Sequence, residues 1–330
     1  MPEPENIRPG SENRYFCRRL SGVIMKITVL GCGALGQLWL SALHRQGHEV
    51  QGWLRNAHSG THVHITAPDG EMHRHWFPAN RQALLADCEL LLVTLKAAQI
   101  SSAVLQIQPL LPSRCIIVLM HNGMGVVDEL PPLPQTVLRA ITTHSAWRQQ
   151  GRVIHVAHGV THIGPVASNE NHLSPLADLL HEALPEVAWH NDILPACWNK
   201  LAINCVINPL SIKYDCTNGE LLQYGGEITT LCEEIAAVMN REGLHADARQ
   251  LEQNVTHVMQ NSAANYSSML QDIRTGRTTE TDYITGYLLR KAAGYGLAAP
   301  ANRELYQRVK IKESANGHPK ISAGLSGAWQ

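Results

Sequence analysis

The segment that most constrains the fold of this chain is a glycine motif between an apolar run and an amphipathic stretch. Residues 25–30 form a short, mostly apolar run, residues 34–46 carry apolar side chains at helical spacing, and the motif between them reads Gly31-Cys32-Gly33-Ala34-Leu35-Gly36. In a G-x-G-x-x-G at a strand-to-helix turn, the first glycine permits the tight turn, the second admits a pyrophosphate, and the third allows close packing. The motif therefore predicts a dinucleotide-binding Rossmann unit in which all six residues line the cofactor; a glycine-rich turn without a ligand is the alternative.

The second predicted strand, residues 50–54, indicates which dinucleotide is bound. An acidic residue at the end of this strand would accept hydrogen bonds from the ribose 2'-hydroxyl of NAD. Here Glu49 lies at the beginning of the strand, and Arg55 follows its end. A guanidinium at that place suits the 2'-phosphate of NADP, so the sequence favours NADP(H), unless Arg55 is only a solvated loop residue.

The rest of the chain predicts an α/β fold with two domains. Strand-like runs at 90–95, 115–120 and 137–143, with a helical segment at 99–111, indicate an N-terminal Rossmann-type doubly wound parallel sheet. Residues 153–164 suggest a hairpin, and after residue 194 the pattern is almost wholly helical. We expect a disordered extension (1–24), an NADP-binding Rossmann domain (25–192), an all-helical substrate and catalytic domain (193–312) and a loose tail (313–330).

Charge and cysteine content exclude several classes of partner. With 27 Lys and Arg against 28 Asp and Glu, the net charge is -1, which provides no overall attraction to nucleic acid or to an acidic membrane. The weakly polar stretch 22–43 is interrupted by Lys26 and by glycines, so no membrane span is expected. The eight cysteines are scattered without a C-x-x-C pair, which is typical of reduced thiols in a reducing compartment.

Three polar residues recur every four positions in an otherwise apolar helical segment. Lys200, Asn204 and Asn208 share one face of this helix, while apolar residues cover the rest of its circumference. A buried amine or amide costs free energy unless it finds a partner. This pattern favours a buried helix whose polar stripe faces a polar cleft; a stripe facing solvent is the alternative.

Further motifs follow in a fixed order along the chain. They are Val93-Thr94-Leu95-Lys96, His121-Asn122-Gly123-Met124-Gly125, the segment from Lys200 to Asn208-Pro209, and Ser267-Ser268-Met269-Leu270-Gln271-Asp272 followed by Glu280. Together with the glycine motif they resemble the ketopantoate reductase family, from about residue 25 to about residue 313. The resemblance implies NADPH-dependent reduction of 2-dehydropantoate to (R)-pantoate, in the cytoplasm, for pantothenate synthesis.

The same resemblance implies roles for individual residues. It makes Lys200 the general acid that protonates the ketone oxygen, and it makes Glu280 a contact of both cofactor and substrate. The substrate would be held by Asn122, Asn204, Asn208, Asn265 and Ser268, and the cofactor would also be bound by Arg55, Lys96, Asn122 and the backbone of Ala146. Asn218 is a further substrate-binding candidate that is equally explained as a helix cap or a turn.

Histidines gather in the predicted hairpin. His155 and His158 would point to opposite faces of a strand, and His162 lies further along, so no metal site is expected there. Ordinary hairpin histidines are the interpretation we adopt.

Two other functions are open at the level of sequence. One is a related β-hydroxyacid dehydrogenase that acts on another short keto or hydroxy acid. The other is a catalytically idle NADP-binding sensor, against which the presence of Lys200 argues. For any of these, we expect a small-molecule ligand, no nucleic acid, no membrane, and a monomer or small homo-oligomer.

Overall fold

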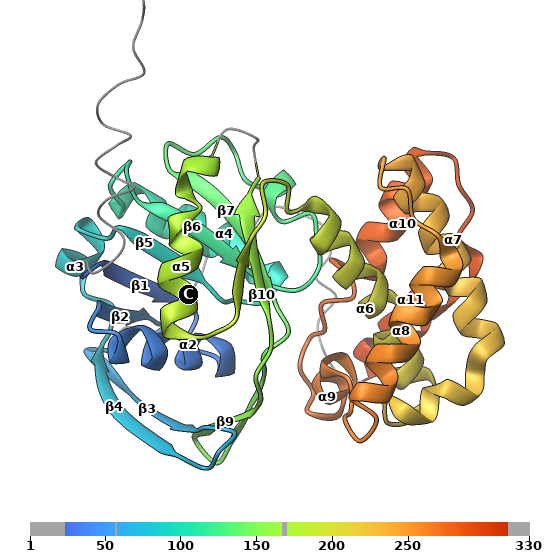
Figure 1. Ribbon diagram of the computed structural model, residues 1–330, viewed down its shortest axis with the longest axis horizontal. Helices are drawn as coiled ribbons and strands as arrows, with labels where there is room; N and C mark the ends of the chain where they lie inside the picture. Colours follow the sequence, from blue (N-terminus) through green and yellow to red (C-terminus); the bar gives the residue numbers. More distant parts are fainter. Residues whose placement is uncertain (1–23, 57, 167–169, 316–330) are drawn as a thin grey trace, which may run out of the picture. The chain divides into compact units, whose positions relative to one another are not determined.

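The computed structural model describes residues 24–56, 58–166 and 170–315, and these form two compact units (Figure 1). The α/β unit runs to His121 and again from Asp128 to Ala196, and the helical unit comprises Asn122–Val127 and the chain from Cys197 on. The expected extension lies outside the described residues except for Ile24, as does the expected tail beyond residue 315. Helices and strands carry the labels of Figure 1.

The α/β unit is built on a seven-stranded sheet. Its order is β11-β10-β7-β6-β5-β1-β2, with bounds β1 Lys26–Leu30, β2 Glu49–Trp53, β5 Leu90–Val93, β6 Ile116–Met120, β7 Thr136–Thr142, β10 Thr161–Pro165 and β11 Val187–Trp189. The pairs from β7 to β2 are all parallel, whereas β10 runs antiparallel to β7. β5 and β6 are buried along their whole length, as expected for parallel strands covered on both faces. The predicted parallel α/β sheet is confirmed.

Helices α2 (Ala34–Arg45), α3 (Gln82–Ala86), α4 (Ala97–Ile107) and α5 (Pro175–Ala183) accompany this sheet. α2 and α5 contact each other (Figure 1), and both contribute to the main apolar core. In α2 the side chains of Trp39 and Leu43 have no exposed surface. Burial of these large side chains is what holds α2, and hence the glycine turn before it, on the sheet.

A second sheet in this unit was not expected. It has four strands in the order β4-β3-β9-β8, with β3 Gly60–Thr66, β4 Met72–Pro78, β8 Ser145–Gln149 and β9 Arg152–Ala157. The predicted hairpin over 153–164 is wrong, because its two halves are β9 and β10, which belong to different sheets. β9 pairs with β8 and β3, while β10 pairs with β7 and β11. Local β-branched composition indicates extended backbone but does not identify its partner.

The histidines of this region also differ from expectation. His158 lies beyond Ala157, the last residue of β9, so strand alternation does not govern its direction. Its side chain comes close to those of His155 and His144, so the expectation of opposite faces is wrong. His162 takes no part in this group; its Nδ1 lies 2.8 Å from Nε2 of His190.

Within its described residues, the helical unit from Cys197 on contains helices and turns but no strand, which confirms the expected C-terminal architecture. Its elements are α6 (Leu194–Tyr214), η4 (Gly219–Tyr224), α7 (Gly225–Arg241), α8 (Ala248–Asn261), α9 (Ser268–Arg274), α10 (Thr285–Gly294) and α11 (Pro300–Ala315). α6 begins three residues before the boundary between the units. Among the described helices, none combines the length and apolar character needed to cross a lipid bilayer.

The end of α11 corrects the expected start of the tail. Residues 313–315 are helical, and Glu313 is buried. Its Oε1 accepts hydrogen bonds from the backbone N–H of Thr279 at 2.8 Å and from the Thr279 hydroxyl at 2.6 Å. Composition near residue 313 could not reveal this anchor, because the partner lies in a distant turn.

Candidate active site

The glycine turn between β1 and α2 has no room for side chains at two of its positions. Gly31 has φ +97°, and a Cβ there would lie 2.6 Å from Cδ2 of Leu95. A Cβ on Gly36 would lie 1.9 Å from the carbonyl oxygen of Gly31. That oxygen also accepts a hydrogen bond of 2.5 Å from the hydroxyl of Thr94, just beyond β5. Any side chain at residue 31 or 36 would therefore distort the turn.

The middle glycine faces open space instead. A Cβ on Gly33 would meet no atom within 4 Å, and Gly33 is the N-cap of α2 without a side-chain capping bond. The first N–H groups of a helix have no acceptor within the helix and carry its positive dipole end. The turn therefore offers backbone donors and free approach to an anion, and it fits the pyrophosphate of a dinucleotide.

The end of β2 lies beside this turn. The backbone N–H of Gly31 donates to the carbonyl of Trp53 at 3.2 Å, and Arg55 is exposed two residues further on. Glu49 is the first residue of β2, at the opposite end of the strand. The charged side chain beyond the end of β2, where the adenosine ribose of a dinucleotide would be bound, is thus the guanidinium of Arg55, which suits a 2'-phosphate.

Three further residues of the α/β unit, Lys96, Ala146 and Cys32, are candidate cofactor contacts. Lys96 is partly buried and is the N-cap residue of α4, next to the end of β5. Ala146 lies on β8, paired with His155, and packs against the main core. Burial raises the pKa of the Cys32 thiol to about 12, so this residue of the glycine motif stays protonated.

Sequence reasoning missed Arg148 on β8. Its charge lowers the pKa of the Cys32 thiol, against the effect of burial, so a second guanidinium lies near the glycine turn. No motif connects Arg148 to the turn, because only the pairing of the second sheet brings β8 there.

α6 presents the polar stripe predicted from the four-residue spacing. Lys200 and Asn204 are partly buried and Asn208 is buried, while the flanking Leu201 and Cys205 are buried apolar residues. The predicted helix with an apolar circumference is confirmed. Because such a helix is fixed by packing on its other sides, its polar side chains are held in defined positions.

The amine of Lys200 has unusual acidity. Burial lowers its pKa to about 8, and the negative charge of Glu280 partly opposes that shift. A group with a pKa near the working pH can both hold and release a proton, which is what general acid catalysis requires.

Glu280 is itself held by a residue distant in sequence. Nδ2 of Asn122 donates to Oε2 of Glu280 at 3.2 Å. The adjacent Gly123 has φ +81°, and a Cβ there would lie 2.5 Å from the carbonyl oxygen of Tyr283, which also accepts a hydrogen bond from Met124 N–H at 2.7 Å. This close approach of backbones brings Asn122, Glu280 and the charge of Lys200 together within the helical unit.

Ser268 is connected to α6 through its neighbour. The hydroxyls of Ser211 on α6 and of Ser267 lie 2.6 Å apart. Ser267 also caps α9, since its Oγ accepts from the backbone N–H of Leu270 at 3.0 Å. Ser268, the first residue of α9, is exposed, and its position is fixed relative to the helix that carries Lys200.

Asn265 and Asn218 lie together in a different arrangement. The backbone N–H of Asn218 donates to the carbonyl of Asn265 at 2.9 Å, and Asn265 is exposed. The side chain of Asn218 is buried and donates to the hydroxyl of Ser262 at 2.9 Å. Asn218 therefore holds the loop that carries Asn265.

A doubly wound sheet with an anion-binding glycine turn, joined to a helical unit that carries a lysine of lowered pKa, defines a dinucleotide-dependent oxidoreductase. Residues 27–168 match the family Ketopantoate reductase PanE/ApbA, and residues 192–313 match its C-terminal domain. The chain belongs to the ketopantoate reductase family. Enzymes of this family reduce ketopantoate to pantoate with NADPH in pantothenate biosynthesis.

Individual relatives agree with this assignment. A 2-dehydropantoate 2-reductase of Yersinia pestis is 52% identical over 308 residues, covering 92% of this chain and 100% of that protein. One of Escherichia coli O157:H7 is 51% identical over 305 residues, with the same coverage. Among solved structures, a PanE/ApbA family ketopantoate reductase from Ralstonia eutropha JMP134 has a TM-score of 0.78 at 26% identity, covering 89% of this chain and 100% of that one.

Proposed function

We propose that this chain reduces 2-dehydropantoate to (R)-pantoate with NADPH, in the cytoplasm, as a monomer or small homo-oligomer. The observation that carries the proposal is the Lys200 amine, whose pKa is about 8 and which feels the charge of Glu280. It supports an acid role because reduction of a ketone needs a proton at the oxygen as negative charge develops there.

NADPH, when bound, supplies the hydride. Lys200 gives its proton to the developing alkoxide oxygen, and Glu280 favours the ammonium form because its carboxylate raises the pKa of the amine. Asn122 fixes that carboxylate through its hydrogen bond. In this arrangement Lys200 acts on the substrate, and the pair of Asn122 and Glu280 sets its charge and also borders the substrate and the nicotinamide.

The substrate is held from two sides of the helical unit. Asn204 and Asn208 share the face of α6 that carries Lys200, and their amides can bind the polar groups of a keto acid. Ser268 and the Asn265 loop supply further donors for its carboxylate. Asn218 takes a supporting part, because its side chain is already bonded to Ser262.

The α/β unit binds the cofactor. The backbone of the six-residue glycine motif receives the pyrophosphate at the N-terminus of α2, and Arg55 binds the 2'-phosphate. Lys96, at the start of α4, and the backbone of Ala146 on β8 line the remainder of the pocket. Gly33 supports this role most directly, because the space where its Cβ would lie contains no atom within 4 Å and leaves room for a pyrophosphate.

Steady-state kinetics with NADPH and a panel of keto acids test the proposal. Ketopantoate is expected to give the highest kcat/KM, compared with 2-ketoisovalerate, pyruvate and phenylglyoxylate. Higher kcat/KM on one of the other acids would instead identify a related hydroxyacid dehydrogenase. NADPH binding without turnover of any acid would identify an idle sensor.

A further inference from the structure

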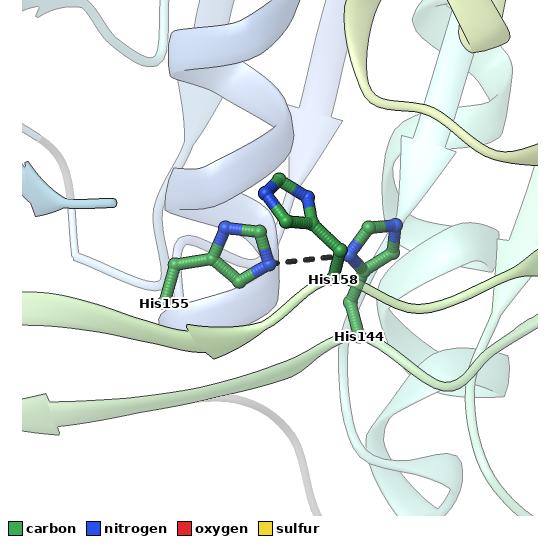
Figure 2. Close-up of side chains that lie close together, drawn as sticks. All are labelled: His144, His155 and His158. Carbon is green, nitrogen blue, oxygen red and sulfur yellow. Dashed lines mark hydrogen bonds between the residues drawn. The ribbon is translucent and has the colours of Figure 1, made fainter. Parts of the chain in front are cut away.

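We propose that His144, His155 and His158 form a binding site for a divalent transition-metal ion of the zinc class. Each residue offers one ring nitrogen, and these nitrogens all lie within 4.8 Å of one another (Figure 2). Imidazole is a preferred ligand of Zn²⁺, Ni²⁺ and Cu²⁺ but not of Mg²⁺ or Ca²⁺. The site lies wholly within the α/β unit and does not depend on the proposed function.

The three histidines come from the two strands of one antiparallel pair and lie near the same end of it. His144 directly precedes β8, His155 lies on β9, and His158 follows the end of β9. β8 and β9 pair antiparallel, with an irregularity of register between Ser145 and Ala146. This irregularity lies next to His144, where the hairpin opens, so the three rings meet at the open end of the hairpin.

Two of the ligands already have the spacing of a coordination site. Nδ1 of His144 lies 3.2 Å from Nε2 of His155 (Figure 2). Tetrahedral zinc with Zn–N bonds of about 2.0–2.1 Å places its nitrogen ligands about 3.3 Å apart. His158 is exposed and lies in the loop after β9, so a small rotation can bring its nitrogen to the same spacing.

The hydrogen bonds of the pair show what a metal would replace. The backbone N–H of Gly159 donates to Nδ1 of His144 at 3.1 Å, so that nitrogen acts as an acceptor. The same Nδ1 shares a hydrogen bond with Nε2 of His155, and the proton of that bond therefore lies on His155. A metal bound to both nitrogens takes the place of this proton, which moves to the other nitrogen of the His155 ring, and the Gly159 N–H must then find another acceptor.

The experiment is a Zn²⁺ titration of the full, untagged, chelator-treated chain, followed by calorimetry and by metal analysis after dialysis. The chain has 18 histidines and eight cysteines, so the site is identified by the difference between variants. His155→Asn and His158→Asn are each expected to lose one equivalent of Zn²⁺ or to weaken it at least about tenfold. His162→Asn is the matched control, because His162 pairs with His190 outside the cluster. Mg²⁺ is expected not to bind at this site.

Visible absorption spectra with Co²⁺ show whether the histidines are ligands of the bound ion. Co²⁺ is expected to give visible absorption bands of a nitrogen-bound ion in the wild type and in His162→Asn, and these bands should be lost in His158→Asn. His158 is exposed, so its variant is expected to keep the metal-free melting temperature of the wild type. Equal Zn²⁺ affinity and equal Co²⁺ spectra in wild type, His155→Asn and His158→Asn would overturn the proposal.

Discussion

The two units use different parts of the chain for function. In the α/β unit the candidate contacts come mainly from backbone groups of one contiguous turn, whereas in the helical unit they come from side chains of Asn122, Lys200 and Glu280, which are distant in sequence. A backbone site tolerates changes of side chain as long as the turn keeps its path. A side-chain site depends on each residue, and the largest single effects are therefore expected in the helical unit.

Lys200→Ala is expected to have the largest effect, a fall in kcat of about 10² to 10⁴, which is the contribution of a positioned general acid. NADPH affinity should stay close to normal, because the cofactor contacts proposed above lie mainly in the other unit. Lys213→Ala is the control, since Lys213 lies on the same helix but pairs with Glu227 at 2.6 Å. Steady-state kinetics and NADPH titration give both quantities. A kcat for Lys200→Ala near that of the control would mean that the proton comes from another group or from water.

Gly36→Ala is expected to be the most damaging change in the α/β unit. Its Cβ would lie 1.9 Å from the Gly31 carbonyl oxygen, and overpacking of this kind costs about 1–3 kcal/mol. Gly33→Ala is the matched variant, since its Cβ meets nothing within 4 Å. Thermal unfolding should show a lower melting temperature for Gly36→Ala and little change for Gly33→Ala, which should instead weaken NADPH binding. Equal melting temperatures would argue against the tight turn described here.

Arg55→Ala tests whether one side chain of the α/β unit selects the cofactor. A charge-assisted bond to phosphate contributes about 1.5–3 kcal/mol, so NADPH binding should weaken by about one to two orders of magnitude while NADH binding stays unchanged. Arg45→Ala, at the exposed end of α2, is the control. Fluorescence titration with both cofactors gives the ratio. Equal losses of affinity for NADPH and NADH would show that Arg55 does not bind the 2'-phosphate.

The pH dependence of the reaction should show the smallest effect. Since Lys200 must be protonated to act as an acid, reduction should decline as pH rises through about 8, and the reverse reaction should increase over the same range. Glu280→Gln removes the charge that raises the pKa of Lys200, so the decline should move to lower pH. Profiles of kcat against pH for both directions measure the shift. An unchanged pH profile in Glu280→Gln would show that the Glu280 carboxylate does not influence the pKa of the catalytic acid.

Part of the fold could be predicted directly from local sequence patterns, and part could not. Of the five strands from β7 to β2, three (β1, β5 and β6) are short, mostly apolar runs between turns, so they were predictable from local sequence. β3 and β4 were missed although Val63 and Ile65 alternate with histidines, because a seven-residue strand with four polar positions resembles a loop when its neighbours are unknown. The pairing of β9 with β3 depends on the second sheet, which no short segment specifies.

The site shows the same limit. The stripe of Lys200, Asn204 and Asn208 was evident from spacing alone, because all three lie on one helix. The bond between Asn122 and Glu280 was not, since it depends on Gly123 approaching Tyr283 across a long stretch of chain. For those two residues the family resemblance supplied what physical reasoning on the sequence could not.

The short segment Asn122–Val127 has an evolutionary consequence. It belongs to the helical unit although it lies between two strands of the α/β unit, so the chain passes between the units three times. A recombination event that exchanged everything after Ala196 would bring a new Lys200 and Glu280 but keep the old Asn122. Such a hybrid gene would combine a carboxylate and an amide that had not been selected together. An exchange of the helical unit at Ala196 would therefore separate Asn122 from the Glu280 to which it is hydrogen-bonded.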